Sequence, residues 1–488
     1  MTERVPLLLD RIREAIARDP EAPAFLGAAP ISYGAMRALV SNTMRALDGQ
    51  GIRAGQVVAL TMSQSPMHII TFLALARLGV ISLSVSPIPL DADRAALYRR
   101  FGVTAVVSEL ANAGAPGVLL IHLQGMGAKG TETEFDTWSY EPVGATPLRI
   151  ALTSGTVGEQ KGIEQSHEDF ARRLDRRHYG EAERPRVLPP NLHVTAALSL
   201  ACHALTRGGT VVFPPGYDAA SLTATIQRFD VTTLTFPPAH IAMMLPTLPE
   251  NGPAFPTVTH FRLMSTAPSA AFLEELRRKV TPHVFVPYST TETGVIAIAT
   301  PELLEKEPGC AGRIVPDAEL EVIGEGGRVL PPNTPGEIRV RTPGMPRGYF
   351  GNADATRFRD GWFHPRDTGY VTEEGVVYIQ GRIDEVINVG GRKLAPRHAE
   401  AILEEDPAVR EAAVFPLDAM TVGAIIAAKG PIDWTHLDEF ARTRLEVFAP
   451  VRYYEVAELP RNPLGKIRRP ELPALAVSAG ATLRHPAQ

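Results

Sequence analysis

The segment 153–162 concentrates groups that can bind anions. It reads TSGTVGEQKG, with hydroxyls, glycines and Lys161 directly after the apolar run LRIAL. Backbone amides of a glycine-rich loop can form a nest for an anion, and hydroxyls add donors without charge. No glycine stands immediately before Lys161 and Gly162 follows it, so this is not a Walker A loop, and it lacks the dinucleotide fingerprint G-x-G-x-x-G. On composition alone, a triphosphate-binding loop and an ordinary glycine-rich turn fit equally well.

The surrounding sequence predicts the elements that would position this loop. From residue 31 to about residue 208, helical stretches such as MRALVSNTMRALDGQGI alternate with β-branched runs such as QVVALTM. This alternation is typical of a mostly parallel sheet covered by helices. After about residue 309 strands and turns dominate, and near GRIDEVINVGGRK the alternation returns. We predict an α/β protein with a large N-terminal domain of α/β subdomains (1–381), which includes a small β-rich subdomain (309–381), and a smaller α+β C-terminal domain (382–488).

Composition excludes several classes of function. The chain has 488 residues, too many for one ordinary core, and a net charge of -5, which gives no attraction for nucleic acid or anionic lipid. Only Cys202 and Cys310 occur, without the spacing of a disulfide framework or a zinc site. The most apolar stretch, 68–85, contains Arg77 and reads as a buried helix followed by a strand. The N-terminus reads as an amphipathic helix without signal-peptide features. We therefore expect a cytoplasmic protein with no nucleic-acid partner and no membrane span.

One basic stretch needs an interpretation of its own. It reads ARRLDRRHYGEAERPR (171–186), is interrupted by acids and is predicted to be helical at its start. A solvated helix face is preferred over an anion-binding patch, because acidic and basic residues alternate along it.

Five segments, in order along the chain, resemble the signature motifs of the adenylate-forming superfamily, which contains acyl-CoA synthetases, nonribosomal-peptide adenylation domains and firefly luciferases. They are TSGTVGEQKG, VPYSTTETG (286–294), DGWFHPRDTGY (360–370), YIQGRIDEVINVGGRKLAP (378–396) and LPRNPLGKIRR (459–469). The resemblance covers essentially the whole chain. It implies a reaction in which ATP activates a carboxylic acid, and a C-terminal domain that is mobile.

The resemblance also implies a nucleotide site. The 153–162 loop would hold the β- and γ-phosphates. Tyr288 would stack on adenine, Thr291 would contact the α-phosphate, and Glu292 would hold Mg²⁺ together with phosphate oxygens, as is usual for this ion. Asp367 would accept the ribose hydroxyls, with Arg382 as a further donor. The full set expected at ATP or AMP is Thr153, Ser154, Gly155, Thr156, Lys161, Thr266, Ala267, Tyr288, Thr291, Asp367 and Arg382.

In the C-terminal region the resemblance assigns catalysis and motion. Lys466 would join Thr291 and Glu292 as a catalytic residue, because its ammonium could neutralise charge that builds on the carboxylate and the α-phosphate. The alternative is a surface lysine. Asp384 matches the hinge residue, and the alternative there is a turn carboxylate. Gly390 and Gly391 would let a thin pantetheine arm approach the backbone closely.

The acid pocket is less well specified by the sequence. In PPNLHVTAALSLACHAL (189–205), His193 matches a histidine that lies beside the substrate carboxylate in acyl- and aryl-CoA ligases, and Ala196 and Ala197 are candidates for the cavity wall. His193 could also be a packed histidine, and His203 and His240 are predicted to be structural. No acid or base is placed to bind an amino group, so we expect an aryl or a short- to medium-chain aliphatic acid.

Several positions depart from the family pattern. Side chains stand where glycine or proline is usual at Gln160, Ser289, Arg366, Ser265 and Thr266. The charged groups Lys161, Glu292, Asp367, Arg382 and Lys466 are all retained. A protein that had lost its activity would be expected to have lost at least one of them.

The leading interpretation is an AMP-forming acid–thiol ligase that uses ATP, Mg²⁺ and coenzyme A. The first alternative is an enzyme that loads an acyl group onto a carrier protein. The second, of a different class, is a catalytically silent nucleotide-binding protein. The sequence leaves the identity of the acid and the oligomeric state open.

Overall fold

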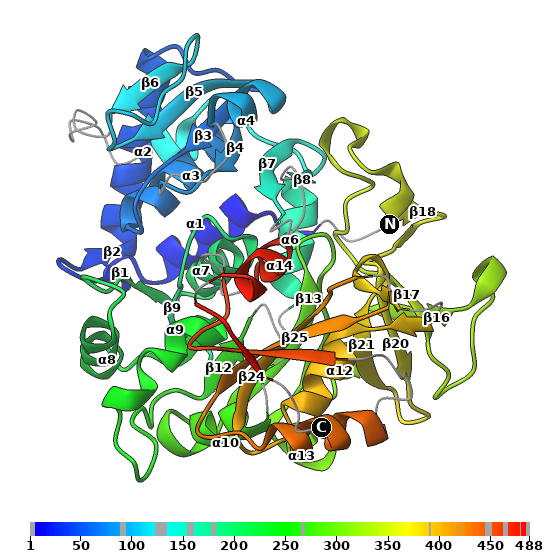
Figure 1. Cartoon of the computed structure of the whole chain (residues 1–488). Coiled ribbons are helices and arrows are strands. Elements are labelled where there is room, and N and C mark those ends of the chain that lie inside the picture. The colour runs from blue at the N-terminus through cyan, green and yellow to red at the C-terminus, as the bar shows by residue number, and fades with distance from the viewer. Residues whose placement is uncertain are drawn as a thin grey trace.

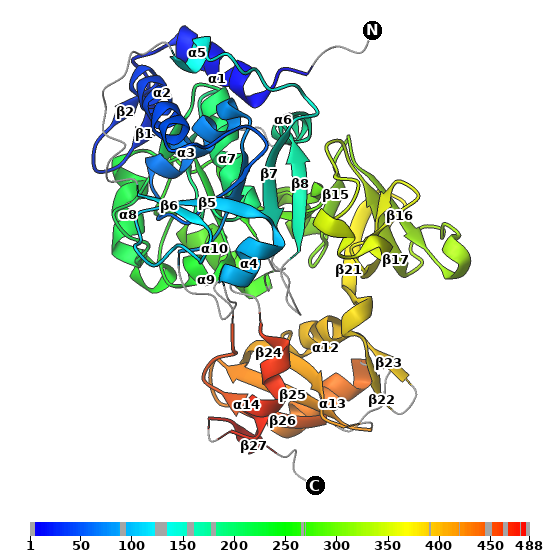
Figure 2. The same cartoon turned by 90° about the horizontal axis from the view of Figure 1, so that it is seen from above.

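The computed structural model describes residues 5–87, 94–122, 134–153, 161–176, 182–264, 268, 270–389, 392–418, 420–444, 451–461, 467–478 and 480–484. The chain folds into a large N-terminal α/β domain and a smaller C-terminal domain, which stands apart as its own lobe in Figure 2. The predicted fold class is confirmed. The boundaries at residues 309 and 381 stay predictions.

The first sheet of the N-terminal domain leads to the 153–162 loop. Its order is β6 (Leu119–His122), β5 (Val103–Ser108), β3 (Val57–Leu60), β4 (Ile81–Ser84), β7 (Pro147–Leu152) and β8 (Gly162–Ser166). All neighbours are parallel except the β7–β8 pair, in which Leu152 lies opposite Gly162. The 153–162 segment therefore connects the parallel strand β7 to its antiparallel partner β8.

The second sheet runs through the rest of the N-terminal domain. Its parallel part is β1 (Pro23–Leu26), β10 (Thr210–Val212), β9 (Arg186–Leu188), β11 (Thr233–Phe236), β12 (His260–Leu263) and β13 (Val284–Thr290), with β2 (Ile31–Ser32) antiparallel at the edge. From β13 onward the pairing is antiparallel. This part contains β14 (Gly294–Ala299), β15 (Gly312–Ile314), β21 (Val376–Arg382), β20 (Asp367–Val371), β17 (Gly336–Arg341), β16 (Glu319–Ile323), β19 (Trp362–Phe363) and β18 (Phe358–Arg359). The predicted β-rich region is thus continuous with the parallel sheet through β13 (Figure 1).

Helices cover and separate these two sheets. They are α1 (Leu8–Arg18), α2 (Tyr33–Gly49), α3 (Pro66–Leu78), α4 (Arg94–Arg100), α5 (Glu134–Thr137), α6 (His167–Asp175), α7 (Thr195–Thr206), α8 (Ala219–Arg228), α9 (Pro238–Ala242), α10 (Ala270–Lys279) and α11 (Pro301–Lys306). The main core joins side chains of α1, α2, α3, α6 and α7 to both sheets.

Helix α3 explains the most apolar stretch of the sequence. It is buried from His68 to Leu78, as expected for a helix that is apolar all round. Pro66 begins it, and Gly79 ends it in the left-handed conformation, where a Cβ would collide with the ring of Tyr140. The helix-then-strand prediction for 68–85 is confirmed, since β4 follows. Among the described residues, no helix is long and apolar enough to cross a membrane.

The C-terminal domain is built on a second small core. Strands β24 (Val409–Pro416), β25 (Val422–Ala428), β26 (Val451–Val456) and β27 (Thr482–Arg484) form one sheet, and β22 (Ile387–Val389) pairs with β23 (Arg392–Leu394). The helices of this domain are α12 (Pro396–Leu403), α13 (Trp434–Arg444) and α14 (Leu472–Ala476). Apolar clusters pack on both faces of the sheet. Helix α12 packs beside β21, where the chain leaves the N-terminal domain (Figure 2).

Candidate active site

The base of the glycine-rich loop is closed by one backbone hydrogen bond. The N–H of Thr153 donates to the carbonyl of Lys161 at 2.8 Å. Between them, the predicted phosphate ligands Ser154, Gly155 and Thr156 lie outside the described residues. Thr266, Ala267, Gly390, Gly391 and Lys466 lie outside them as well.

Lys161 has two partners, and one of them also contacts a buried glutamate. Its Nζ lies 2.6 Å from Asp354 Oδ2 and 5.1 Å from the centre of the Tyr349 ring. The Tyr349 hydroxyl donates to Glu292 Oε1 at 2.5 Å. Burial and the neighbouring carboxylate raise the pKa of Tyr349, so the tyrosine keeps its proton and remains a donor. The lysine of one predicted motif and the glutamate of another are therefore joined through a tyrosine that belongs to none of the predicted motifs.

A second cluster forms where β13 meets the β20–β21 hairpin. The Tyr288 hydroxyl donates to Asp367 Oδ2 at 2.5 Å, and Arg382 Nη1 lies 3.4 Å from Asp367 Oδ1. Asp367 and Arg382 are register partners on β20 and β21. Burial raises the pKa of Asp367, while the Tyr288 hydrogen bond and the Arg382 charge oppose this rise. The three residues that the sequence placed at the nucleoside are thus brought together.

The backbone conformation at Arg366 explains why the family usually has glycine at this position. Its φ is +67°, in the left-handed region that glycine occupies without strain. Its carbonyl accepts a hydrogen bond of 2.7 Å from the N–H of Ile383, which fixes Asp367 against the end of β21. Arg366 therefore holds a strained backbone conformation directly before Asp367.

Arg173 of α6 and Arg176, which follows the helix directly, bind backbone carbonyls in and just after the Thr291–Glu292 turn. Arg173 donates to the carbonyl of Thr291 at 2.7 Å and also to that of Glu292, and Arg176 donates to the carbonyls of Thr293 and Val295 at 2.6 and 2.7 Å. Both arginines are buried. The prediction of a solvated helix face was wrong for them, because the last turn of α6 packs against β13 and β14 instead of facing water. Charge alternation along the sequence could not reveal this contact.

The predicted hinge residue lies in an ion network between the domains. Asp384 accepts from Arg382 Nε and Nη2, both at 3.0 Å, and Arg357 Nη2 lies 3.5 Å away. The neighbouring Glu385 lies 3.3 Å from Arg469, which also forms a bidentate pair with Glu400 of α12 at 2.7 and 2.9 Å. The segment that follows β21 is therefore held by charges from both domains.

The predicted acid-pocket residues lie at the start of α7. His193 precedes the helix, and its Nδ1 lies 2.8 Å from Asn191 Oδ1. Burial lowers the pKa of His193 to about 4, so the ring is neutral at pH 7. Ala197 is fully buried while Ala196 is exposed, so the two alanines face different surroundings. The histidines predicted to be structural are packed: His203 contacts the carbonyl of Leu174, and His240 stacks on Phe236.

With this geometry described, the comparisons with known proteins decide the family. A family model described as AMP-binding enzyme matches residues 12–350. The chain belongs to the AMP-binding enzyme family. The superfamily predicted from the five motifs is thereby confirmed.

Individual relatives match this AMP-binding enzyme over nearly its whole length. It is 28% identical to the indoleacetate–CoA ligase of Aromatoleum aromaticum, over 91% of this chain and 92% of that protein. It is also 28% identical to the fatty acid–[acyl-carrier-protein] ligase ScoC of Streptomyces coeruleorubidus, over 93% of each. Among solved structures, an O-succinylbenzoate coenzyme A synthetase from Bacillus subtilis, in complex with ATP and magnesium ion, has a TM-score of 0.83 at 23% identity, over 95% of this chain and 98% of that one. This likeness shows the shared fold.

The donor set of the AMP-binding enzyme fits a magnesium ion brought in by a nucleotide. Within the described part of the chain, no cluster of three or more His, Cys, Asp or Glu could hold a metal. Glu292 supplies a single buried carboxylate. One carboxylate and the oxygens of a substrate phosphate are a common set of ligands for Mg²⁺.

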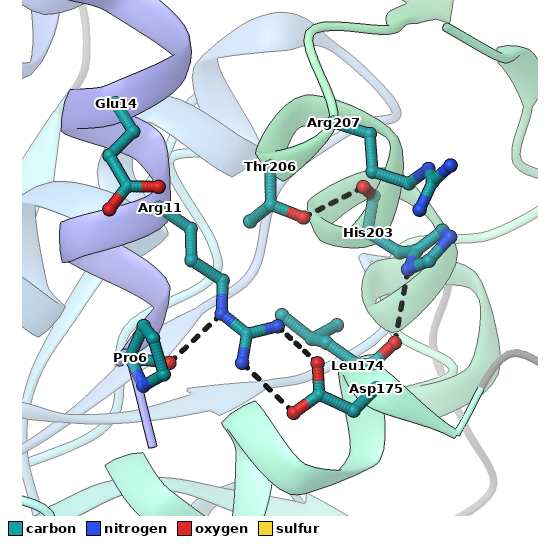
Figure 3. A pocket seen from close by; sticks show the side chains of 8 residues that line it. All are labelled: Pro6, Arg11, Glu14, Leu174, Asp175, His203, Thr206 and Arg207. Atoms are coloured by element: carbon teal, nitrogen blue, oxygen red, sulfur yellow. Dashed lines mark hydrogen bonds and ion pairs between the residues drawn. The ribbon is translucent and has the colours of Figure 1, made fainter. Parts of the chain in front are cut away.

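A separate polar cavity lies away from these residues. It has a volume of about 310 Å³ and opens between α1 and the C-terminal ends of α6 and α7 (Figure 3). Arg11 crosses it, pairing with Asp175 at 2.5 Å and donating to the carbonyl of Pro6 at 2.9 Å. None of the residues predicted for the nucleotide or the acid lines it.

Proposed function

We propose that this AMP-binding enzyme joins a carboxylic acid to coenzyme A in two steps. In the first, the carboxylate attacks the α-phosphorus of ATP and releases pyrophosphate, which gives an acyl-adenylate. In the second, the thiol attacks the acyl carbon and AMP leaves. The activity named for the indoleacetate–CoA ligase, which this chain matches over nearly its full length, supports the proposal.

The observation that carries the proposal is the arrangement around the end of β13. On one side, Tyr288 donates to Asp367, which also contacts Arg382. On the other, Tyr349 donates to Glu292, and its ring contacts Lys161. A nucleoside and a triphosphate need these two environments: a ring with a carboxylate for the ribose hydroxyls, and a cation with a metal ligand for the phosphates. The β13 strand supplies Tyr288 to the first, and the turn that follows it supplies Glu292 to the second.

Each residue then has a role in the first step. Tyr288 stacks on adenine, and Asp367 with Arg382 binds the ribose. Lys161 exchanges Asp354 for the terminal phosphates. When bound, Mg²⁺ neutralises charge on the phosphates, and Glu292 is its protein ligand. Arg173 keeps the carbonyl side of the Thr291–Glu292 turn fixed, so that the Thr291 side chain faces the α-phosphate.

The C-terminal domain completes the chemistry in this proposal. Lys466 approaches the carboxylate and the α-phosphate during adenylate formation. The domain then turns about Asp384, and Gly390 and Gly391 admit the pantetheine arm for the second step. His193, at the start of α7, lies beside the acid.

A second candidate acceptor is a carrier protein. It is favoured by the similarity to ScoC, whose name states that it ligates fatty acids to an acyl-carrier protein. The two candidates share the first step and differ only in the thiol.

The test is to incubate the protein with Mg-ATP, a pool of aryl and aliphatic acids, and coenzyme A, and to identify the products by mass spectrometry. An acyl-CoA supports the leading proposal and names the acid. An adenylate without a thioester, converted only when a phosphopantetheinylated carrier protein is added, favours the second candidate. Pyrophosphate release that does not depend on any acid, or no product at all, argues against both.

A further inference from the structure

Arg149 is a buried cation without an anionic partner. It lies in the middle of β7, opposite Ser82 of β4 and Gln165 of β8, and its residue is 1% exposed. Among the described residues it forms no ion pair and donates no hydrogen bond, and its Nη1 is a buried donor without an acceptor. Its one ring contact is with Phe170, 6.0 Å from the ring centre. Burial lowers the pKa of Arg149 to about 10, so it is still charged at neutral pH.

Two other buried arginines show how this chain normally satisfies a guanidinium. Arg77 donates to the carbonyls of Phe135 and Trp138, both at 2.8 Å, and pairs with Glu141 at 3.0 Å. Arg173 donates to three carbonyls around the Thr291–Glu292 turn. A buried charge is costly unless it is paired and hydrogen-bonded. The burial of the Arg149 charge therefore has a free-energy cost that hydrogen bonds offset for Arg77 and Arg173 but not for Arg149.

Further unpartnered polar atoms lie on two histidines that feel the charge of Arg149, and on Thr195, two residues after one of them. The rings of His68 and His193 touch edge to face, with their centres 5.0 Å apart. His68 Nδ1, His193 Nε2 and Thr195 Oγ1 are buried and have no hydrogen-bond partner among the described residues. Burial lowers the pKa of both histidines, and the nearby charge of Arg149 lowers both further.

The chemistry of these atoms points to an anion. His68 Nε2 lies 3.2 Å from Ser84 Oγ; when the serine donates, Nδ1 carries the proton and is a free donor. The Thr195 hydroxyl can donate as well. A planar guanidinium binds a carboxylate through two parallel hydrogen bonds, which suits a single negative charge. The donors come from β7, α3 and the start of α7, next to the position proposed for the acid.

We propose that Arg149, together with His68 and Thr195, forms a subsite for a second carboxylate of the acid substrate, so that the preferred substrates are dicarboxylic acids. The inference rests on the proposed function, which it makes more specific: one carboxylate reacts near Thr291, and the other is held at Arg149.

The experiment compares acids that differ only in the second carboxylate. Aliphatic diacids of four to six carbons and an aryl diacid are each paired with their monomethyl ester, and kcat/KM is measured from acid-dependent pyrophosphate release. We expect the wild type to prefer the diacids and Arg149→Met to reduce the diacid-to-ester ratio at least about 30-fold, since removing one partner of a buried charge pair has effects of this size. Arg149→Lys keeps the positive charge but cannot form two parallel hydrogen bonds, so it should reduce the diacid-to-ester ratio less.

Arg77→Met is the matched control, because Arg77 is equally buried but fully partnered. It should lower the melting temperature and leave the ratio unchanged. Arg149→Met should not lower the melting temperature without acid, since it removes an unpaired buried charge. Diacids alone should raise the melting temperature of the wild type more than that of Arg149→Met.

The outcomes separate this inference from the proposed function. Activation of the esters but not the diacids by the wild type would overturn the subsite and leave the ligase intact. An Arg149→Met variant that is destabilised like Arg77→Met, with an unchanged ratio in Arg149→Lys, would assign Arg149 a structural role and also overturn it. If no acid or ester is activated, the proposed function fails, and equal melting shifts with diacids in wild type and Arg149→Met then overturn the subsite as well.

Discussion

Lys161 and Asp354 are 193 residues apart in the chain, yet their Nζ and Oδ2 atoms lie 2.6 Å apart. Asp354 also lies 3.3 Å from Arg357, whose Nη2 lies 3.5 Å from Asp384. Burial alone would raise the pKa of Asp354, but hydrogen bonds from Lys161 and Thr356 hold it at about 2. In the proposed function, this carboxylate competes with the ATP phosphates for Lys161.

Asp354→Asn should therefore lower KM for ATP about two- to fivefold, because a partly exposed ion pair contributes up to about 1 kcal/mol. The measurement is acid-dependent pyrophosphate release at varied ATP. Asp48→Asn, in an exposed pair with Arg53, is the control and should leave KM unchanged. A raised KM in Asp354→Asn would mean that the carboxylate positions Lys161 instead of competing for it.

Tyr349→Phe removes the donor to Glu292 and should weaken the use of Mg-ATP. A hydrogen bond to a charged group contributes about 1.5–3 kcal/mol, so we expect kcat/KM for Mg-ATP to fall about 10- to 100-fold. Tyr378→Phe is a matched control, since Tyr378 of β21 also donates to a glutamate, Glu307, at 2.6 Å. Equal losses in both variants would show that general stability, and not the Glu292 contact, explains the effect.

Lys466→Ala should abolish adenylate formation while the protein still converts added acyl-adenylate to thioester. The physical reason is that a single ammonium neutralises charge only in the first transition state. The two half-reactions are measured separately by pyrophosphate release and by thioester formation. Lys429→Ala changes an exposed lysine of the same domain and should affect neither. An unchanged rate of adenylate formation in Lys466→Ala would contradict the catalytic role of Lys466.

Asp384→Pro should slow thioester formation far more than adenylation, because a fixed φ limits rotation at a hinge. Asp384→Ala loses the same contacts with Arg382 and Arg357 but keeps the backbone free. It should therefore slow the second step much less. If both variants slow both steps equally, Asp384 is a structural carboxylate.

The stability of the protein should fall below pH 6.5, in part because of His167. Both ring nitrogens of His167 are buried without partners in the described part of the chain, and burial lowers its pKa to about 4 from 6.5. Between these values the unfolded chain binds the proton and the folded chain does not, so stability is present above pH 6.5 and is lost as pH falls toward 4, at about 1.4 kcal/mol per pH unit.

His167→Gln should make this loss less steep, as measured by urea unfolding at pH 7.5, 6 and 5. His436→Gln, on an exposed position of α13, should leave the slope as in the wild type. The same slope in His167→Gln and wild type would show that the buried imidazole takes up its proton without unfolding.

Local sequence patterns predicted the fold class and the elements well. The apolar run around α3, the alternation of helices and parallel strands, and the change to antiparallel strands are all set by side chains close in sequence. The motifs also placed Tyr288, Asp367 and Arg382 in one site. The spacing of residues within each motif can be seen in the sequence, and the family resemblance predicted that the separate motifs meet in one site.

The contacts that tune the site could not be predicted this way. Arg173 and Arg176 were predicted to be exposed to solvent. Both are buried instead, because the end of α6 packs against the turn that carries Glu292. Asp354 and Tyr349 stand in no motif, and they matter because the β-rich region brings them to Lys161. Arg149 looks like any polar residue within a strand.

The sequence by itself thus determined the family, the order of the elements and the residues of the signature motifs, because periodicity and turn chemistry act over a few neighbouring residues. Only the tertiary structure decided which charges are paired. Ion pairs and buried hydrogen bonds join residues from different sheets and helices, and whether a guanidinium such as that of Arg149 finds an acceptor depends on how those elements pack.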